Sequence, residues 1–177
     1  VLQKKLILCV LEKIRCPKQI DVKKIEVKKG QILQRKGDLS SRKYSVEKGL
    51  LRSYTIDEKG KEHLFMFAPE GWIIADASSV NGPTDLFIEA LENSIILVLD
   101  EGVQFTESDT IRLIKRIAVL QKRAIMLMSA SAIERYDDFL KTYPDIVQRV
   151  PQKMIASYLG ITPEALSKVK SAKTKGL

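Results

Sequence analysis

Short runs of alternating apolar and polar residues between about Asp21 and Leu99 predict β-strands. The candidate strands are residues 24–27, 32–34, 43–46, 50–56, 61–67, 87–91 and 94–99. Gly and Pro residues mark the turns between them. Residues 57–60 give the most specific hairpin signal, because Gly60 can adopt a left-handed backbone conformation. Strands of this length and spacing predict a sandwich or a barrel-like roll.

Residues 106–131 change to a helical period, and their basic side chains gather on one face of the predicted helix. The rest of its surface is apolar over roughly 200°, wider than the stripe of a helix that covers a single core. We therefore expect two apolar partners, the β domain and the same helix of a second subunit. The candidate dimer positions have 3-4 spacing and are Ile111, Ile114, Ala118, Gln121, Ile125 and Met128. A helix buried inside one chain is the alternative.

Small residues at 129–132 predict a break, which could act as a hinge, before a second helix at about 133–142. Tyr143 and Pro144 end that helix, because the residue before a proline disfavours the helical conformation.

Residues 152–170 have the spacing of a helix-turn-helix. Gly160 lies where the first helix must stop and the chain must turn. Thr162 is placed to cap the second helix, and Pro163 suits its first turn. The small and apolar positions that pack the two helices crosswise are Ile155, Ala156, Leu159, Ile161, Leu166 and Val169. An αα-hairpin packed in a core would show the same spacing.

The charge of this segment favours a nucleic-acid partner over a buried hairpin. Residues 149–177 hold six Lys and Arg residues against Glu164 alone, a net +5 within the chain's formal +8. A buried hairpin does not need that charge, whereas neutralisation of phosphates does. Lys173 and Lys175 lie beyond Val169, and we expect them to form a solvated basic tail without specific contacts.

The remaining composition excludes several other classes. The apolar stretches at 6–11 and 124–128 are far too short for a membrane span, and the first does not resemble a signal peptide, so we expect a cytoplasmic protein without a membrane partner. Cys9 and Cys16 cannot by themselves complete a four-ligand zinc or iron–sulfur site, and the presence of a single histidine, His63, weakens metal chemistry further. No phosphate-binding glycine loop is present. We expect no enzymatic activity, no metal and no cofactor.

This order of elements resembles the Crp/Fnr family of bacterial transcription regulators. Within that family, it resembles the branch that is common in Bacteroidetes-type bacteria. The matching residues are Glu134 to Tyr136, Phe139 and Leu140, Tyr143 and Pro144, Val150 to Gln152, Ile155 to Glu164, Leu166 and Ser167. The resemblance implies an α+β chain: an antiparallel β-roll like a cyclic-nucleotide-binding jelly roll, an N-terminal helix, a long dimerisation helix and a C-terminal helix-turn-helix. It divides the chain into a sensor at 1–105, dimerisation and hinge helices at 106–148, and a DNA-binding domain at 149–177.

The effector residues of the family match this chain poorly. Cyclic-AMP binders of the family carry Gly-Glu at the ribose, whereas here Trp72 follows Gly71. Thr84 stands at the position of the phosphate-binding arginine, and Asp85 adds a carboxylate beside it. These four residues form the predicted effector pocket. We expect its effector to be an unknown small molecule, and we expect that cyclic AMP does not bind. Trp72 has two interpretations, a plug in the core of the roll or a ligand-stacking side chain.

The resemblance also implies a homodimer on a near-palindromic DNA operator, with RNA polymerase as a candidate partner. Pro163, Glu164, Ser167 and Lys168 would face the major groove, while Gln152, Lys153 and Lys170 would contact phosphates; Thr162 completes the predicted DNA-binding set. Glu164 has an alternative role, which is to stabilise the positive end of its helix. The rival functions are a cupin-like enzyme, which one histidine cannot support, and a ligand-sensing module whose basic tail binds membrane or RNA.

Overall fold

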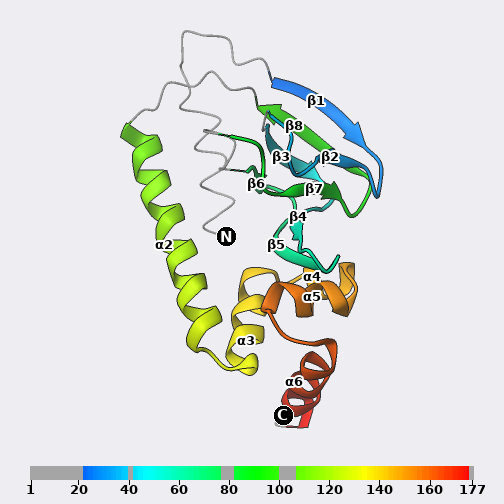
Figure 1. Ribbon diagram of the computed structural model, residues 1–177, viewed down its shortest axis with the longest axis vertical. Helices are drawn as coiled ribbons and strands as arrows, with labels where there is room; N and C mark the ends of the chain where they lie inside the picture. The colour runs from blue at the N-terminus through cyan, green and yellow to red at the C-terminus, as the bar shows by residue number, and fades with distance from the viewer. Residues whose placement is uncertain (1–21, 40–41, 77–81, 100–106, 176–177) are drawn as a thin grey trace. The chain divides into compact units, whose positions relative to one another are not determined.

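The computed structural model describes residues 22–39, 42–76, 82–99 and 107–175 (Figure 1). Within this part, the side chains of residues 22, 107–113, 115, 116 and 175 are not described. The predicted N-terminal helix, together with Cys9 and Cys16, lies outside the described residues. The chain separates into two compact units, the first holding nearly all of the β-structure and the second holding residues 104–177 with Glu62–Leu64.

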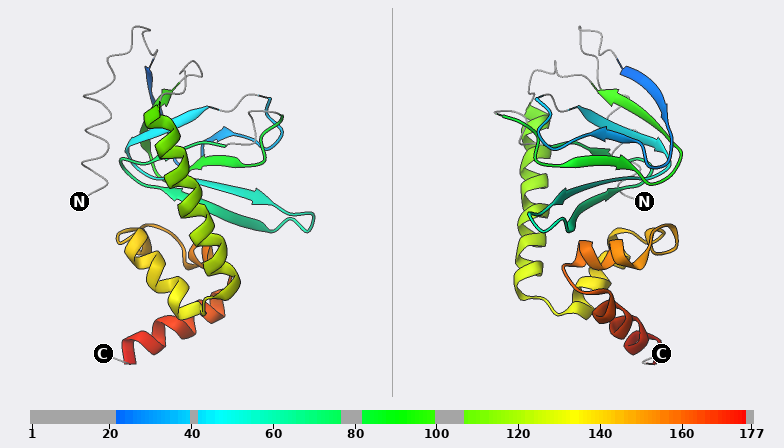
Figure 2. Two further views of the ribbon diagram at one scale, coloured as in Figure 1. Left: turned by 90° about the vertical axis from the view of Figure 1, so that its left-hand side faces the viewer. Right: turned by 45° about the vertical axis from the view of Figure 1, so that its right-hand side comes forward.

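Eight described strands form two four-stranded sheets, and all of their residues except Glu62–Leu64 belong to the first unit. The strands are β1 (Val22–Val27), β2 (Ile32–Gln34), β3 (Lys43–Lys48), β4 (Leu51–Ile56), β5 (Glu62–Ala68), β6 (Ile73–Ile74), β7 (Phe87–Ala90) and β8 (Ser94–Leu99). One sheet has the order β1-β8-β3-β6 and the other β2-β7-β4-β5. Figure 2 shows the strands of this unit curving around a common interior, and the predicted antiparallel β-roll is confirmed.

The core of the roll follows from the alternation along its strands. In β8 every second side chain is buried, and Ile96 is fully enclosed. Val46, Leu51 and Ile88 join it from β3, β4 and β7, so both sheets contribute to one cluster. Trp72 is partly buried and packs against this cluster, which favours the plug over the ligand-stacking interpretation.

Seven of the eight strands lie within a few residues of the predicted ranges, whereas the sequence does not predict β6. Ile73 and Ile74 pair with Ser45 and Tyr44 of β3, but two residues are too few to show a period. The turn at 57–60 is confirmed. The carbonyl of Asp57 accepts a hydrogen bond from the amide of Gly60 at 2.9 Å, and Gly60 has a φ of 76°.

Five described helices make up the rest of the second unit. They are α2 (Glu107–Ser129), α3 (Ala132–Thr142), α4 (Ile146–Arg149), α5 (Gln152–Leu159) and α6 (Pro163–Lys175). Figures 1 and 2 show α2 as one long helix with the short helices gathered near its C-terminal end. The break after α2 is confirmed, and α3 then begins with a capping box in which Ser131 and Glu134 bond each other's backbone amides.

An aromatic cluster forms the core among the short helices. Phe139 contacts Tyr136, Tyr143 and Tyr158, with ring centroids 6.4, 5.4 and 5.5 Å away. All four side chains are buried. Because Tyr158 belongs to α5 and the other three rings to α3 and its C-terminal end, the cluster joins the helix-turn-helix to the helix that precedes it.

Candidate nucleic-acid interface

The turn between α5 and α6 has the geometry that the sequence predicts. Gly160 is left-handed, with a φ of 67°, and the next amide, that of Ile161, donates to the carbonyl of Ala156 at 3.0 Å. This is the arrangement by which a glycine ends a helix and reverses the chain. Ala156 is buried where the second helix approaches, as expected from its small side chain.

The packed side of the helix-turn-helix is also as predicted. Ile155 and Leu159 of α5 and Leu166 and Val169 of α6 are buried, and Leu166 has no exposed surface. Because these residues fix one side of α6 against the unit, its opposite side is the one available for a partner.

The first turn of α6 is stabilised by its own side chains. The hydroxyl of Thr162 accepts a hydrogen bond from the amide of Ala165 at 3.2 Å, which confirms the predicted cap. The backbone amide of Glu164, and next the side chain of Thr162, hold the pKa of the Glu164 carboxyl below its usual value. The carboxylate therefore already serves the helix N-terminus. The structure favours this local role for Glu164, and base contact remains a prediction.

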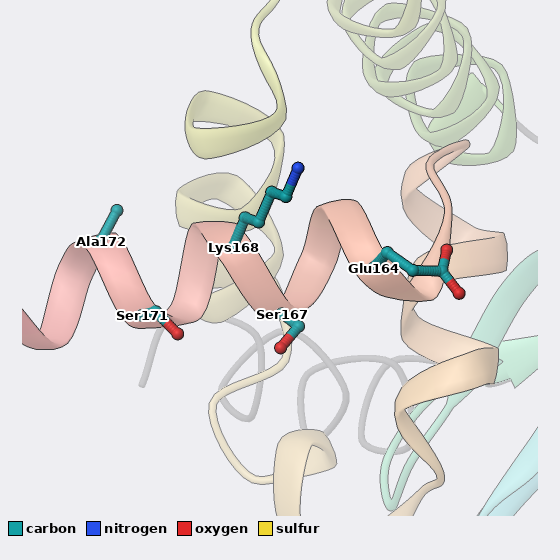
Figure 3. A pocket seen from close by; sticks show the side chains of 5 residues that line it. All are labelled: Glu164, Ser167, Lys168, Ser171 and Ala172. Atoms are coloured by element: carbon teal, nitrogen blue, oxygen red, sulfur yellow. The ribbon is translucent and has the colours of Figure 1, made fainter.

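The free side of α6 carries the residues that we expect to face the groove. Glu164, Ser167 and Lys168 are exposed and line one shallow hollow together with Ser171 and Ala172 (Figure 3). The labelled side chains come from three successive turns of the helix. Ser171 and Ala172 are additions to the predicted set. Their signal in the sequence is a spacing of four from Ser167 and Lys168, which keeps them on the same side.

A second shallow hollow brings two predicted phosphate contacts together. Gln152 at the start of α5 and Lys170 of α6 both line it, with Ser167, Ser171 and Thr174. Lys153 is exposed and lines neither hollow. Ser167 lines both hollows, so the two share a border on α6, whereas Thr162 and Pro163, like Lys153, line neither.

The expected solvated tail is wrong for Lys173. The helix α6 continues to Lys175, and the ammonium of Lys173 donates to the carboxylate of Asp137 in α3. It also lies 5.9 Å from the centre of the Tyr136 ring. The apolar period that ends at Val169 gives no sign of this contact, because beyond Val169 the helix is joined to α3 by an ion pair between side chains distant in the sequence.

Two arginines that the sequence does not single out connect α2 with α5. Arg135 donates to the carbonyls of Leu127 in α2 and Leu159 in α5, at 2.8 and 3.1 Å. The guanidinium of Arg123, on the basic face of α2, stacks 4.0 Å from the centre of the Tyr158 ring. The two helices of the helix-turn-helix, α5 and α6, are called the reader below. Its first helix, α5, is thus attached to the end of α2 by two cationic side chains and to α3 by the aromatic cluster.

The predicted dimer face of α2 is open in the single chain. Ile114, Ile125 and Met128 are 61%, 56% and 85% exposed, and Ala118 and Gln121 are exposed as well. The side chain of Ile111 lies outside the described residues. Four more large apolar side chains of α2 are exposed, namely Ile117, Val119, Leu120 and Leu127. Such a continuous apolar surface on a helix is typical of an interface.

The four predicted effector residues belong to two segments of the roll. Gly71 and Trp72 pair with Val46 of β3 through backbone hydrogen bonds of 2.7 and 2.9 Å. Thr84 is buried, and its hydroxyl donates to the carbonyl of Arg35 at 2.7 Å. The amide of Asp85 donates to Asp76 at 2.8 Å. The two segments are thus held by different backbone partners, and a pocket formed by all four residues remains a prediction.

The described residues contain no group of three or more His, Cys, Asp or Glu side chains that could hold a metal ion. Within the same part of the chain, no helix combines the length and apolar content needed to cross a bilayer.

Comparisons with known proteins agree with this architecture. Residues 24–105 match the cyclic nucleotide-binding domain. The regulatory protein HlyX of Actinobacillus pleuropneumoniae is 28% identical over 167 residues, which are 83% of this chain and 70% of HlyX. The fumarate and nitrate reduction regulatory protein of Vibrio cholerae is 28% identical over 171 residues, 85% of this chain and 68% of the relative.

A solved structure extends the likeness to the whole order of elements. A transcriptional regulator of the CRP/FNR family from Thermus thermophilus superposes with a TM-score of 0.66 at 18% identity, over 87% of each chain. The shared architecture is a β-roll followed by a long helix and a helix-turn-helix. The domain match, the two relatives and this structure all agree with the resemblance to the Crp/Fnr family of transcription regulators.

Proposed function

We propose that the chain is a homodimeric, sequence-specific DNA-binding transcription regulator of the Crp/Fnr type. The observation that carries the proposal is the exposed side of α6, where Glu164, Ser167 and Lys168 line one shallow hollow. The helix-turn-helix that holds α6 has its left-handed glycine, Gly160, at the end of α5. Regulators of this family bind DNA and are generally dimeric. The net positive charge of residues 149–177 supports the same partner.

In this proposal α6 lies in the major groove and reads bases from its exposed side. Lys168 donates to the O6 and N7 acceptors of a guanine, while Ser167 contacts a base or a phosphate. Pro163 and Thr162 set the start of the helix at the groove. Gln152, Lys153 and Lys170 neutralise phosphates, which fixes the position of the reader without specifying sequence.

In the proposed dimer, two copies of the chain contact each other along α2, and each contributes one helix-turn-helix to the same operator. A two-fold dimer favours an inverted repeat whose half-sites lie about 34 Å apart, one turn of the duplex. The five described dimer positions are exposed in the single chain, which supports α2 as the contact between copies. This assigns sensing to residues 1–105, dimerisation to 106–148 and DNA reading to 149–177.

An effector of the roll would act by changing the angle of the helices around residues 129–132. To do so it must bind the two arrangements with different affinity. We propose a small molecule other than cyclic AMP as effector and RNA polymerase as the protein partner at the promoter. The site of action is the cytoplasm, where the bacterial chromosome lies.

The division of roles on α5 and α6 is testable with two variants. Lys168→Ala removes a base contact, so it should cut affinity for the operator by about 1–3 kcal/mol and relax preference at one base position. Lys153→Ala removes a phosphate contact, so it should weaken all duplexes alike and lower the salt slope by about one. Fluorescence anisotropy on cognate and scrambled duplexes over a salt series measures both.

Lys59→Ala is the matched control, because Lys59 is exposed on the hairpin of the roll and far in sequence from the reader. It should change neither affinity nor salt slope. Equal losses for Lys168→Ala and Lys153→Ala on both duplexes would refute the division. Binding to anionic vesicles or RNA without binding to duplex DNA would instead support the rival sensing module.

A further inference from the structure

A buried carboxylate in the roll accepts hydrogen bonds from the backbone of a loop. Asp76 follows β6 and is 7% exposed. Its Oδ2 accepts hydrogen bonds from the amides of Asp85 and Leu86, both at 2.8 Å. The side-chain amide of Gln34, which is 3% exposed, approaches the same oxygen at 3.4 Å.

Two successive backbone amides that converge on one oxygen form an anion site. Such pairs bind the oxygens of phosphates or carboxylates, because their dipoles add and their donors are fixed by the backbone. An isolated carboxylate is costly to bury, and hydrogen bonds from fixed donors offset that cost. Here the anion is supplied by the chain itself.

The neighbouring backbone groups of this loop also form hydrogen bonds within the chain. The amide of Thr84 donates to the carbonyl of Asp38 at 2.9 Å, and its carbonyl accepts from Gly37 at 2.8 Å. The carbonyl of Leu86 accepts from the Gln34 side chain at 2.9 Å. Residues 84–86 are therefore held from both sides by β2, the turn after it and Asp76.

We infer that the amides of Asp85 and Leu86 form an anion site, and that the carboxylate of Asp76 occupies this site as an internal anion. The loop is then ordered without any anionic ligand, and a phosphate-bearing effector is excluded from these amides. The inference rests on the proposed sensory role of the roll and deepens it, since an effector that binds beside Asp76 is neutral or cationic.

Electrostatics and position support the exclusion. A phosphate that approached these amides would have to displace the carboxylate, or lie within a few ångströms of it, where repulsion in a partly buried site exceeds its value in water. The side chain of Asp85 adds a second carboxylate to the same loop. Both carboxylates therefore disfavour a phosphate at this position.

The test is anion rescue in the full chain. Thermal midpoints are measured for the wild type, Asp76→Ala and the control Glu58→Gln, in chloride, formate and inorganic phosphate at equal ionic strength. Glu58 is exposed on the hairpin, so its variant also loses one carboxylate, but at the surface. We expect Asp76→Ala to lose at least about 5 °C in chloride, because two buried amides lose their acceptor.

Formate or phosphate should restore at least half of that loss, after subtraction of the effect of the same salt on the wild type. The wild type and Glu58→Gln should show the same salt effects as each other. Rescue supports the inference. A variant as stable as the wild type, or one whose lost stability no small anion restores beyond the wild-type effect, overturns it.

A second measurement covers the case in which Asp76→Ala does not fold. Asp76→Asn keeps the shape and one acceptor oxygen but not the charge, and hydrogen exchange of the Asp85 and Leu86 amides is followed by NMR. Exchange should be at least about tenfold faster in Asp76→Asn, and millimolar cyclic AMP should leave both amides of the wild type unchanged. Unprotected wild-type amides, or wild-type amides that shift with cyclic AMP, contradict the inference. Neither readout involves DNA, so failure here is distinct from failure of the α6 variants.

Discussion

Replacing Ile125 by Glu in α2 should turn the dimer into a monomer and weaken binding to a palindromic operator by at least about 100-fold. Ile125 is 56% exposed in the single chain and is one of seven large apolar side chains of α2 that are exposed in the same way. A carboxylate there would be buried without a partner in the interface, which costs several kcal/mol. Loss of the second reader then removes the gain in affinity that linked sites provide.

Sedimentation equilibrium and anisotropy on the same samples measure the two effects. Lys122→Ala is the control, because Lys122 lies three residues away on the basic face and makes an exposed ion pair with Asp138 at 3.4 Å. It should remain dimeric. A dimeric Ile125→Glu variant with unchanged affinity would show that the subunits meet elsewhere.

Removing the side chain of Arg135 should destabilise the reader by about 2–4 kcal/mol, because three carbonyls lose a charged donor. The guanidinium donates to Leu127, Ala130 and Leu159 at 2.8, 3.0 and 3.1 Å. These carbonyls lie at or just beyond the C-terminal ends of α2 and α5, where a cation also interacts favourably with the helix dipole. Lysine cannot reach three acceptors at once, so Arg135→Lys should recover only part of the loss.

Hydrogen exchange of the α5 amides reports the opening of this unit, and DNA affinity should fall with it. Lys141→Ala serves as the control, since Lys141 is exposed near the end of the same helix, α3, and should cost less than about 0.5 kcal/mol. Full recovery by Arg135→Lys would mean that a single positive charge, and not the three-way contact, holds the reader.

The parts that the sequence predicts well are those with a repeated local signal. Alternation locates β8, and Gly60 locates the hairpin turn at 57–60. The Gly160 and Thr162 pair locates both ends of the turn in the reader. Each depends on residues close together in the chain, so propensity and period are sufficient.

The parts that it misses depend on long-range contacts between polar groups. Arg135 reaches Leu159, 24 positions away, and Gln34 reaches Asp76, 42 positions away. The sequence predicts a solvated tail at Lys173 because nothing near it in the chain shows that Asp137 is its partner. Such pairs carry no periodic signal, and two-residue strands such as β6 carry too little of one.

In vitro selection from random duplex DNA with the full chain, followed by hydroxyl-radical footprinting of the enriched sequences, tests the central claim most directly. Two readers related by a two-fold axis should enrich inverted repeats and protect two patches with centres about 10–10.5 base pairs apart. Lys168→Ala should relax the base preference at one position of each half-site, and this position should be the same in both half-sites. Enrichment of a single unrepeated half-site, or no enrichment above random DNA, would contradict a dimeric reader that uses α6.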